Sequence, residues 1–310
     1  MTERTLVVIL CETRAGHITF ERFRRHVLDV FDADLALCVA ENDREDRSNP
    51  FYRAADHVWT SPEYDDWGVG IERYTPNIHP RWRELAEFGP QWLGGVRTDP
   101  PHPGSGGILW FFRAFLRHQI AEAGLTDHYD RFIITRSDFV HEIPVPPPEL
   151  VDNRYVWIPA GESHGGYTDR FISCPAAHID QALAVTELFT ADPSTTAELM
   201  RGRTWNPERI LKHVYDTSGL SDIVRPMPYT MYSIREEGGH TSWAAGRYSE
   251  ELGLYVKYPT ELRSARFARA VLRGGDWTAT RFTVVTAVQQ VRVGLRWLTR
   301  PFRRPPRSRG

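Results

Sequence analysis

The segment 129–144, YDRFIITRSDFVHEIP, begins as an apolar run and ends in a charged cluster. Its RFIIT portion has the length and the β-branched content of a buried strand. Ligands of α/β folds bind beyond the carboxyl ends of the strands. We therefore expect Arg136, Ser137 and Asp138 to lie at the rim of a sheet, where a rigid strand presents them to a ligand.

Two further apolar runs of strand length, TLVVILC at 5–11 and ADLALCV at 33–39, enclose a segment with near-helical apolar spacing at 17–32. This pattern predicts a β-α-β unit. A helical crossover usually joins parallel strands, so both strands should end at the same rim. The segment 105–124, SGGILWFFRAFLRHQIAEAG, predicts a long helix with Ser105 as its N-cap.

The rest of the chain predicts a mixed sheet with helices. Strand-like or helical patterns occur at 155–160, 170–174, 176–189, 207–215, 223–224 and 231–234. The segment 42–104 shows little periodicity, and we expect a long functional loop region with small helices there. We predict one α/β domain over 1–263, with a mixed, mainly parallel central sheet, and a helical extension with a basic tail over 264–310.

The composition is that of an ordinary globular protein. Of the 310 residues, 41% are hydrophobic and 25% are charged, which excludes a disordered, collagen-like or disulfide-rich class. The formal net charge of −2 argues against nucleic acid as a partner. Cys11, Cys38 and Cys174 have no metal-type spacing and predict buried thiols in a reducing compartment. The N-terminus lacks signal-peptide features, and no stretch has the roughly 18 to 20 apolar residues of a spanning helix, so we expect a cytoplasmic protein.

Polar clusters follow three of the predicted strands, at 12–17, 41–43 and 135–138. Each cluster alone is a weak signal, because strand ends are polar by default. Since the strands are expected to be parallel, the three clusters should converge on one rim, and the first of them brings Thr13 and Arg14. Together they predict a binding crevice at this rim.

Two blocks of sequence carry a resemblance to a known family. They are RFIITRSDF at 131–139 and, about twenty residues later, IPAGESHGGYTDRFISC at 158–174. They resemble the core of the GT-A-type nucleotide-sugar glycosyltransferases, which have a Rossmann-related fold, and especially a group that acts on bacterial and viral surface glycans. The shared pattern is an apolar strand, Arg-x-Asp in place of the usual Asp-x-Asp, and then Gly-Gly-x-x-Asp-Arg-Phe.

The resemblance implies a nucleotide-sugar donor and a glycan or lipid-linked acceptor. In the wider class, Asp-x-Asp binds a divalent cation, Mn²⁺ or Mg²⁺, that bridges the diphosphate of the donor. Here Arg136 could contact the diphosphate directly while Asp138 holds the metal, which leaves the metal requirement open. The alternative is an exposed Arg136–Asp138 ion pair at a strand end. A late histidine often joins the metal in this class, and His240 in EEGGHTSW is the candidate here. Further donor contacts are expected at Thr13, Arg14, Arg113 and Ser137.

The block GGYTDRF adds candidates for catalysis. Gly165 and Gly166 allow the backbone to approach a ligand closely. An inverting sugar transfer needs a carboxylate that accepts the proton of the acceptor hydroxyl; Asp169 is the first candidate and Glu208, in WNPERI, is the second. The structural alternatives are an ion pair or turn cap for Asp169 and a favourable interaction with the helix dipole for Glu208.

Two other classes of function compete with sugar transfer. The segment 161–165, GESHG, matches the Gly-x-Ser-x-Gly nucleophile elbow of α/β-hydrolases, which would make the chain an esterase. The elbow requires a helix immediately after the serine, whereas the sequence continues with glycines and a strand-like run. A non-catalytic module that binds a nucleotide or a glycan at the same rim is the second alternative.

The C-terminal segment 291–310 has seven arginines and no acidic residue, and it follows an apolar helical stripe. Such a segment could attach the protein peripherally to the inner face of an anionic membrane. The alternative is a solvated tail without a targeting role.

Overall fold

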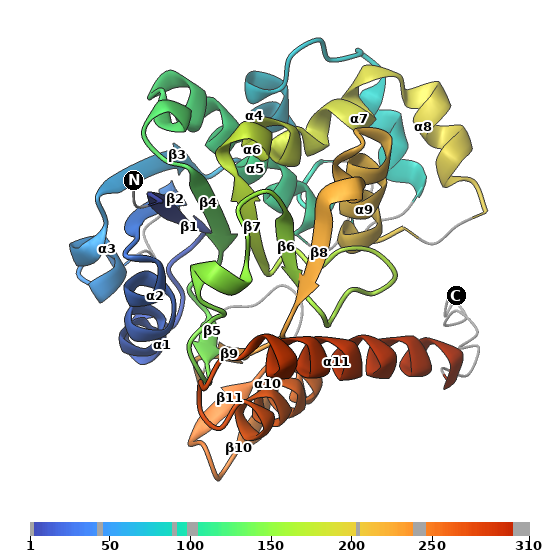
Figure 1. Cartoon of the computed structure of the whole chain (residues 1–310). Coiled ribbons are helices and arrows are strands. Elements are labelled where there is room, and N and C mark those ends of the chain that lie inside the picture. Colours follow the sequence, from blue (N-terminus) through green and yellow to red (C-terminus); the bar gives the residue numbers. More distant parts are fainter. Residues whose placement is uncertain are drawn as a thin grey trace.

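The computed structural model describes residues 3–41, 46–88, 92–97, 105–202, 205–237 and 246–299. Its centre is a seven-stranded sheet with the strand order β3-β2-β1-β4-β7-β6-β8 (Figure 1). The strands are β1 (Thr5–Cys11), β2 (Asp34–Glu41), β3 (His57–Pro62), β4 (Arg131–Thr135), β6 (Val156–Pro159), β7 (Phe171–Pro175) and β8 (Val224–Met227). Only β7 runs against the others, since it pairs antiparallel with β4 and β6. The predicted α/β class and the mixed, mainly parallel sheet are confirmed.

The predicted β-α-β unit is present. α1 (Gly16–Phe23) continues through the π-helical turn η1 (Arg24–Leu28) into α2 (Asp29–Phe31), and β1 then pairs parallel with β2. The chain proceeds to β3 on one side of β1 and returns to β4 on the other side. The connections after β1 and β4 therefore leave in opposite directions, which opens a crevice at the carboxyl ends of these two strands.

The small helices predicted within the segment 42–104 are present, but the segment also contains a strand that was not predicted. It contains α3 (Pro50–Ala54), β3, α4 (Trp67–Tyr74) and the 3-10 helix η2 (Trp82–Phe88). The strand β3 lies at the edge of the sheet and pairs with β2 alone. Its sequence HVWTSP has too few apolar residues to indicate a buried strand, so the pairing with β2 is what extends the chain here.

Each face of the sheet is covered by its own helices. Leu6, Val8 and Leu10 of β1 belong to one core cluster, together with residues of the helices α4 to α9. Val7 and Ile9 point to the other face and pack with residues of α1, α3 and α11. The helices not yet delimited are α5 (Gly106–Glu122), α6 (Ala176–Leu183), α7 (Val185–Ala191), α8 (Pro193–Met200), α9 (Pro207–Thr217), α10 (Pro259–Val271) and α11 (Ala279–Thr299).

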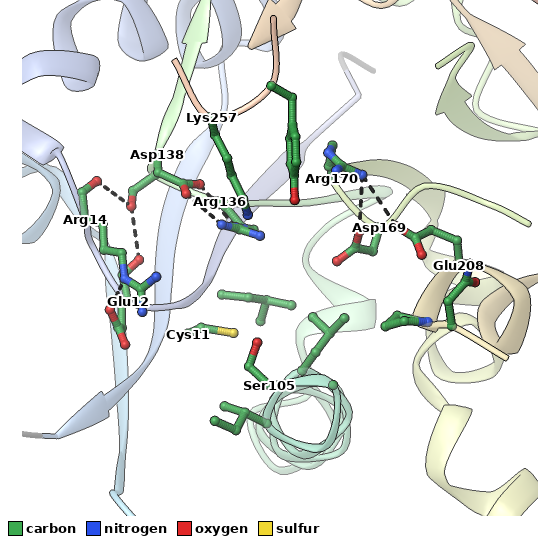
Figure 2. A pocket seen from close by; sticks show the side chains of 18 of the residues that line it. Cys11, Glu12, Arg14, Ser105, Arg136, Asp138, Asp169, Arg170, Glu208 and Lys257 are labelled. Atoms are coloured by element: carbon green, nitrogen blue, oxygen red, sulfur yellow. Dashed lines mark hydrogen bonds and ion pairs between the residues drawn. The ribbon is translucent and has the colours of Figure 1, made fainter. Parts of the chain in front are cut away.

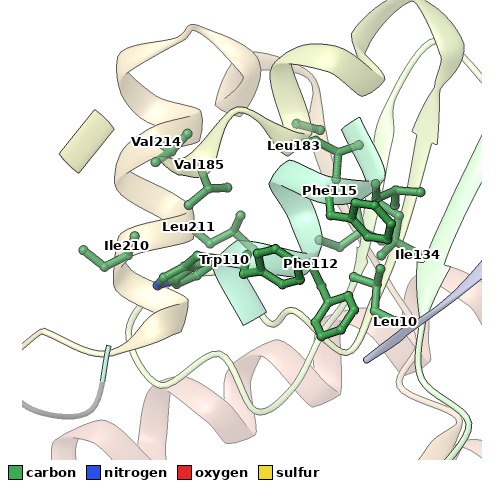
Figure 3. Close-up of a cluster of buried hydrophobic side chains, with 14 of the residues drawn as sticks. Leu10, Trp110, Phe112, Phe115, Ile134, Leu183, Val185, Ile210, Leu211 and Val214 are labelled. Atoms are coloured by element: carbon green, nitrogen blue, oxygen red, sulfur yellow. The ribbon is translucent and has the colours of Figure 1, made fainter. Parts of the chain in front are cut away.

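The helix α5 lies at the centre of the first helical layer and confirms the helix predicted at 105–124. Figure 3 shows Phe112 and Phe115 directed toward Leu10 and Ile134 of the sheet, while Trp110 lies toward α9. All five side chains are nearly inaccessible to solvent. This packing fixes α5 between the sheet and α9, and with it the position of the first turn of α5.

A second, antiparallel sheet has the strand order β10-β11-β9-β5 (Figure 1). Its strands are β5 (Phe139–His141), β9 (Met231–Arg235), β10 (Arg247–Ser249) and β11 (Leu254–Val256). β4 of the large sheet and β5 of the small sheet are separated only by Arg136, Ser137 and Asp138. These three residues therefore lie where the two sheets meet.

Of the two C-terminal helices, α10 packs on the second sheet, whereas α11 packs on α10 and on β8 of the large sheet. α10 contacts β9 and α11, and α11 extends along the lower side of the molecule in Figure 1. α10 begins at Pro259, so the predicted division between 263 and 264 falls inside this helix. Its first turn carries Glu261, a buried carboxylate that accepts hydrogen bonds from Ser233 N and Oγ at 2.7 and 2.6 Å. Glu261 also forms an ion pair with Arg170 at 2.8 Å and thereby connects α10 and the small sheet to the residue just before β7.

We predict that Glu261→Ala lowers the free energy of unfolding by about 3 to 5 kcal/mol, because it leaves the buried Arg170 without its closest counter-ion. Urea denaturation measures this loss. The matched control is Glu251→Ala, which removes a carboxylate from a solvent-exposed ion pair with Arg266 and should cost less than about 1 kcal/mol. Equal losses for the two variants would contradict a structural role of Glu261.

Candidate functional site

A pocket of about 480 Å³ opens beyond the carboxyl ends of β1 and β4 (Figure 2). Its walls come from the loops that follow these strands, the loop before β7, the residues after β11, and the starts of α5 and α9. Arg14, Arg136 and Lys257 lie on one side, which we call the cationic wall. Asp169 and Glu208 lie on the other side, which we call the carboxylate wall. Two of the three predicted polar clusters, at 12–17 and 135–138, therefore meet at this pocket. Glu41 of the third cluster does not line it, and residues 42 and 43 lie outside the described residues.

The loops after β1 and β4 are held together by Ser137. Its hydroxyl lies 3.0 Å from both Glu12 O and Arg14 O, and its proton can be donated to either carbonyl. Cys11 and Ala15, in and beside the first loop, have left-handed backbone with φ of 77° and 54°. Non-glycine residues adopt this conformation at a cost that the surrounding structure must offset. Ser137 therefore shapes the pocket rim, although the sequence predicts a donor contact for it.

Arg136 and Asp138 form a bidentate ion pair, with Nε–Oδ1 and Nη2–Oδ2 distances of 3.1 and 2.6 Å. Asp138 also accepts a hydrogen bond from Arg235 Nη1 at the end of β9. Burial alone would raise the pKa of Asp138, but the charges of Arg136, Arg235 and Lys257 outweigh it and hold the pKa well below its usual range. The ion pair at the strand end is therefore present, but it is not the exposed pair of the alternative, because only 2% of Asp138 is exposed.

The surroundings of Asp138 do not fit a divalent cation. Both carboxylate oxygens already accept hydrogen bonds from arginines, and Lys257 adds a further positive charge nearby. A divalent cation could reach these oxygens only if a guanidinium group moved away from them. The displaced positive charge would then remain next to the cation and repel it. The described residues contain no group of three or more His, Cys, Asp or Glu side chains that could hold a metal ion. The other predicted ligand, His240, lies outside the described residues.

Lys257 is the residue of the cationic wall that the sequence analysis missed. It follows β11, its side chain lines the pocket, and no carboxylate of the described residues lies within ion-pairing distance of its Nζ atom. Burial, together with the charges of Arg136 and Arg235, lowers the pKa of Lys257 to about 7. No motif surrounds Lys257; the only signal in the sequence is that the chain has just two lysines, Lys212 and Lys257.

The carboxylate wall is organised by Arg170. Its Nη1 atom lies 4.0 Å from Asp169 Oδ1 and 3.7 Å from Glu208 Oε1, while its Nε atom pairs with Glu261. The predicted Asp169–Arg170 ion pair is thus present at the limit of ion-pairing distance. Only 13% of each of the Asp169 and Glu208 side chains is exposed.

The two carboxyl groups of this wall have opposite pKa shifts. Burial and the negative charge of Asp169 raise the pKa of Glu208. Burial also acts to raise the pKa of Asp169, but the charges of Arg170, Arg136 and Arg113 outweigh it and lower the pKa. Opposite pKa shifts suit two neighbouring carboxyl groups to different roles in proton transfer. A general base is most effective when its pKa is near the working pH, which favours the group whose pKa is raised.

The loop before β7 is held in an uncommon conformation. Glu162, His164 and Gly165 all have positive φ, of 46°, 42° and 91°. Gly166 packs against the first turn of α9, where Tyr167 N donates a hydrogen bond to Glu208 O at 2.9 Å. A Cβ atom on Gly166 would lie 1.8 Å from that same oxygen. Gly165 and Gly166 are not among the residues that line the pocket, and their contact with a ligand stays a prediction. The close approach that Gly166 allows in the structure is that of its own backbone to α9.

Three other residues named from the sequence have surroundings that the sequence did not indicate. Thr13 does not line the pocket; it accepts a hydrogen bond from Asn49 Nδ2 at 2.6 Å. Arg113 is fully buried on α5 behind the pocket and is not among its lining residues, so it acts on the site only through its charge. Ser105 precedes α5 as predicted, but its side chain makes no capping hydrogen bond and instead lines the pocket.

The rival nucleophile elbow has the wrong structure. Ser163 lies in the loop between β6 and β7, and the next helix, α6, begins only at Ala176 after β7. A nucleophile elbow needs a helix directly after the serine. The structure thus agrees with the context argument made from the sequence.

No family model and no curated protein sequence matches this chain. The pocket itself therefore indicates the function. It combines a lysine that has no ion-pair partner among the described residues, which suits a phosphorylated ligand, with a carboxyl group of raised pKa, which suits proton transfer. Both groups open into one cavity that is large enough for a small substrate.

We predict that Gly166→Ala displaces the first turn of α9, because its Cβ atom would overlap the Glu208 carbonyl oxygen. The free energy of unfolding should fall by about 1 to 3 kcal/mol, as for other substitutions that overfill a packed site. The control is Gly294→Ala on α11, where no atom lies within 4 Å of the added Cβ. That substitution should be neutral or stabilise the helix by up to about 1 kcal/mol. If urea denaturation gives the same stability for both variants, Gly166 has no packing role.

Proposed function

We propose that this protein is a glycosyltransferase that moves a sugar from a nucleotide-sugar donor to a hydroxyl group of a glycan or lipid-linked acceptor. The observation that carries the proposal is the division of one pocket into a cationic wall and a carboxylate wall at the crevice beyond β1 and β4. The resemblance of the blocks at 131–139 and 158–174 to GT-A-type enzymes supports the same assignment, because these blocks supply residues of both walls.

The two walls suit the two ends of a sugar transfer. The diphosphate of the donor would lie at Arg136 and Lys257, and the sugar would project toward Asp169 and Glu208. The bond between the anomeric carbon and the diphosphate oxygen breaks, and its electron pair remains on the diphosphate. The acceptor oxygen forms the new bond to the anomeric carbon and gives up its proton to a carboxylate. The cationic wall stabilises the charge that develops on the leaving diphosphate.

Glu208 is the better candidate for the general base, which reverses the order that the sequence suggests. Its raised pKa makes it a stronger base than an ordinary glutamate once it is ionised. Asp169 is held ionised by Arg170 and Arg136, and its negative charge helps to raise the pKa of Glu208. Asp169 therefore acts indirectly, as a residue whose negative charge raises the pKa of Glu208.

We predict that Glu208→Gln lowers kcat by about 100-fold or more and leaves the dissociation constant of the donor nucleotide nearly unchanged, because the base acts on the acceptor. Asp169→Asn should lower kcat less and shift the rise of kcat/KM with pH toward lower pH, since the pKa of Glu208 falls when its negative neighbour is removed. Release of nucleoside diphosphate from a panel of nucleotide sugars provides the assay.

Glu198→Gln, on the exposed side of α8, is the matched control for these variants. Unchanged turnover in Glu208→Gln would remove Glu208 from the mechanism. If the protein binds nucleotide sugars without releasing nucleoside diphosphate, it is a binding module and the proposed function is wrong.

We further propose that α11 holds the protein against an anionic membrane surface, where lipid-linked acceptors are found. Val284, Val291 and Leu295 are 46%, 60% and 55% exposed and repeat along one stripe of the helix, while Val285 and Gln289 are buried on its opposite side. None of the helices in the described ranges is long and apolar enough to span a bilayer. The arginines of 291–310 would add about 1 kcal/mol each near anionic lipid.

We predict that the full chain co-sediments at low salt with vesicles containing about 30% phosphatidylserine, but not with phosphatidylcholine alone, and that about 0.5 M NaCl releases it. Combined replacement of Val291 and Leu295 by serine, and separately deletion of 300–310, should each weaken this binding. Replacement of Val69, an equally exposed valine on α4, by serine is the control. Unchanged sedimentation of both altered proteins would contradict the membrane role.

A further inference from the structure

Asp138 occupies the position at which the wider class places a metal ligand, but its environment is that of a counter-ion. Two arginines from different sheets, Arg136 after β4 and Arg235 at the end of β9, bind its two oxygens. Arg235 is 94% buried and does not line the pocket, so it fixes Asp138 from behind. The ion pair in turn holds the guanidinium of Arg136 at the pocket surface, where 28% of its side chain is exposed.

The positive charge at this wall exceeds the negative charge next to it. Arg136, Arg235 and Lys257 surround the single carboxylate of Asp138, and Lys257 has no ion-pair partner of its own in the described parts of the chain. Arg14, farther along the wall, is paired with Glu12. An arrangement of this kind attracts an anion and repels a divalent cation.

We propose that the pocket binds the diphosphate of its donor directly through Arg136 and Lys257, without a divalent cation, and that Asp138 is the fixed counter-ion that positions Arg136. This inference rests on the proposed function and names how the same site handles the leaving group. Arginine offers a planar fork of donors to phosphate oxygens, and lysine offers a compact point charge. Together they can supply the positive charge that a bridging metal would otherwise supply.

The low pKa of Lys257 supports this inference. Burial lowers this pKa most, and the charged groups with the largest effects on it are Arg136, Arg235, Asp138 and Arg170, of which only Asp138 is an anion. A bound diphosphate would reverse this excess and favour the protonated ammonium form. Binding should therefore take up a proton near neutral pH and become weaker as the pH rises above about 7.

The test is calorimetric titration of the full chain with inorganic pyrophosphate, once with excess EDTA and once with Mg²⁺. We expect binding in EDTA, with a dissociation constant that Mg²⁺ does not lower. Lys257→Ala should weaken binding by about tenfold or more, the usual value of a charge-assisted contact. Lys212→Ala, which replaces the other lysine of the chain on α9, should leave it unchanged.

A second measurement needs no variant. An amine-reactive reagent should modify Lys257 near neutral pH, because much of it is then the free amine, and pyrophosphate in EDTA should protect it. Lys212, in an exposed ion pair with Asp216, is the internal control that pyrophosphate should not protect. Peptide mass spectrometry distinguishes the two sites. Modification of Lys257 at the same rate with and without pyrophosphate would place the anion elsewhere.

The outcomes separate this inference from the proposed function. Pyrophosphate binding and sugar transfer that both require Mg²⁺ or Mn²⁺ would overturn the metal-free site and leave the glycosyltransferase standing. Pyrophosphate binding in EDTA without turnover of any nucleotide sugar would overturn the glycosyltransferase and leave the anion site standing. Absence of pyrophosphate binding under all conditions would overturn the metal-free site, while turnover of a nucleotide sugar would still decide the proposed function.

Discussion

The buried charge of Arg170 is the constraint on which the site depends. Only 9% of its side chain is exposed, and a guanidinium at such a position destabilises a protein by several kcal/mol unless anions and acceptors surround it. Its partners come from separate parts of the chain: Glu261 from α10, Glu208 from α9, and the carbonyl oxygen of Glu162 from the loop before β7. The ion pairs and the hydrogen bond that surround the Arg170 guanidinium therefore connect the small sheet, the large sheet and the carboxylate wall.

A similar balance of charge governs the other wall. Asp138 joins Arg136 at the end of β4 to Arg235 at the end of β9, so the junction between the two sheets is itself an ion-pair network. Arginine side chains bind both oxygens of Asp138, but Lys257 has no ion-pair partner among the described residues. One wall thus has positive charge available to a ligand, and the other has a carboxyl group of raised pKa. The two walls differ in charge because of the way in which their charged side chains pair with one another.

Four of the seven non-glycine residues with positive φ in the described ranges lie in the segments around the same pocket. Cys11 at the end of β1, Ala15 in the loop after it, and Glu162 and His164 before β7 adopt left-handed backbone although none is a glycine. Strain of this kind persists where the surrounding structure over-determines the conformation, and it is common at binding and catalytic sites. Here the Ser137 hydroxyl supports the first loop, and the side chain of Arg170 supports the second through Glu162 O. The rim is therefore preorganised before any ligand binds.

The sequence by itself determined the elements whose signal is local. Periodicity and apolar content belong to a single element, so the sequence of that element predicts its structure. This holds for the apolar runs of β1, β2 and β4 and for the helical spacing of α5. In the same way, the polar residues after β1 and β4 predict the rim. The tertiary structure alone decided which rim residues line the pocket. Lys257 carries no motif, and β3 pairs only with β2. The pair of Asp138 with Arg136 is local, but its second arginine, Arg235, comes from 97 residues away. Pairing and charge balance between distant segments are long-range properties, and no local pattern contains them.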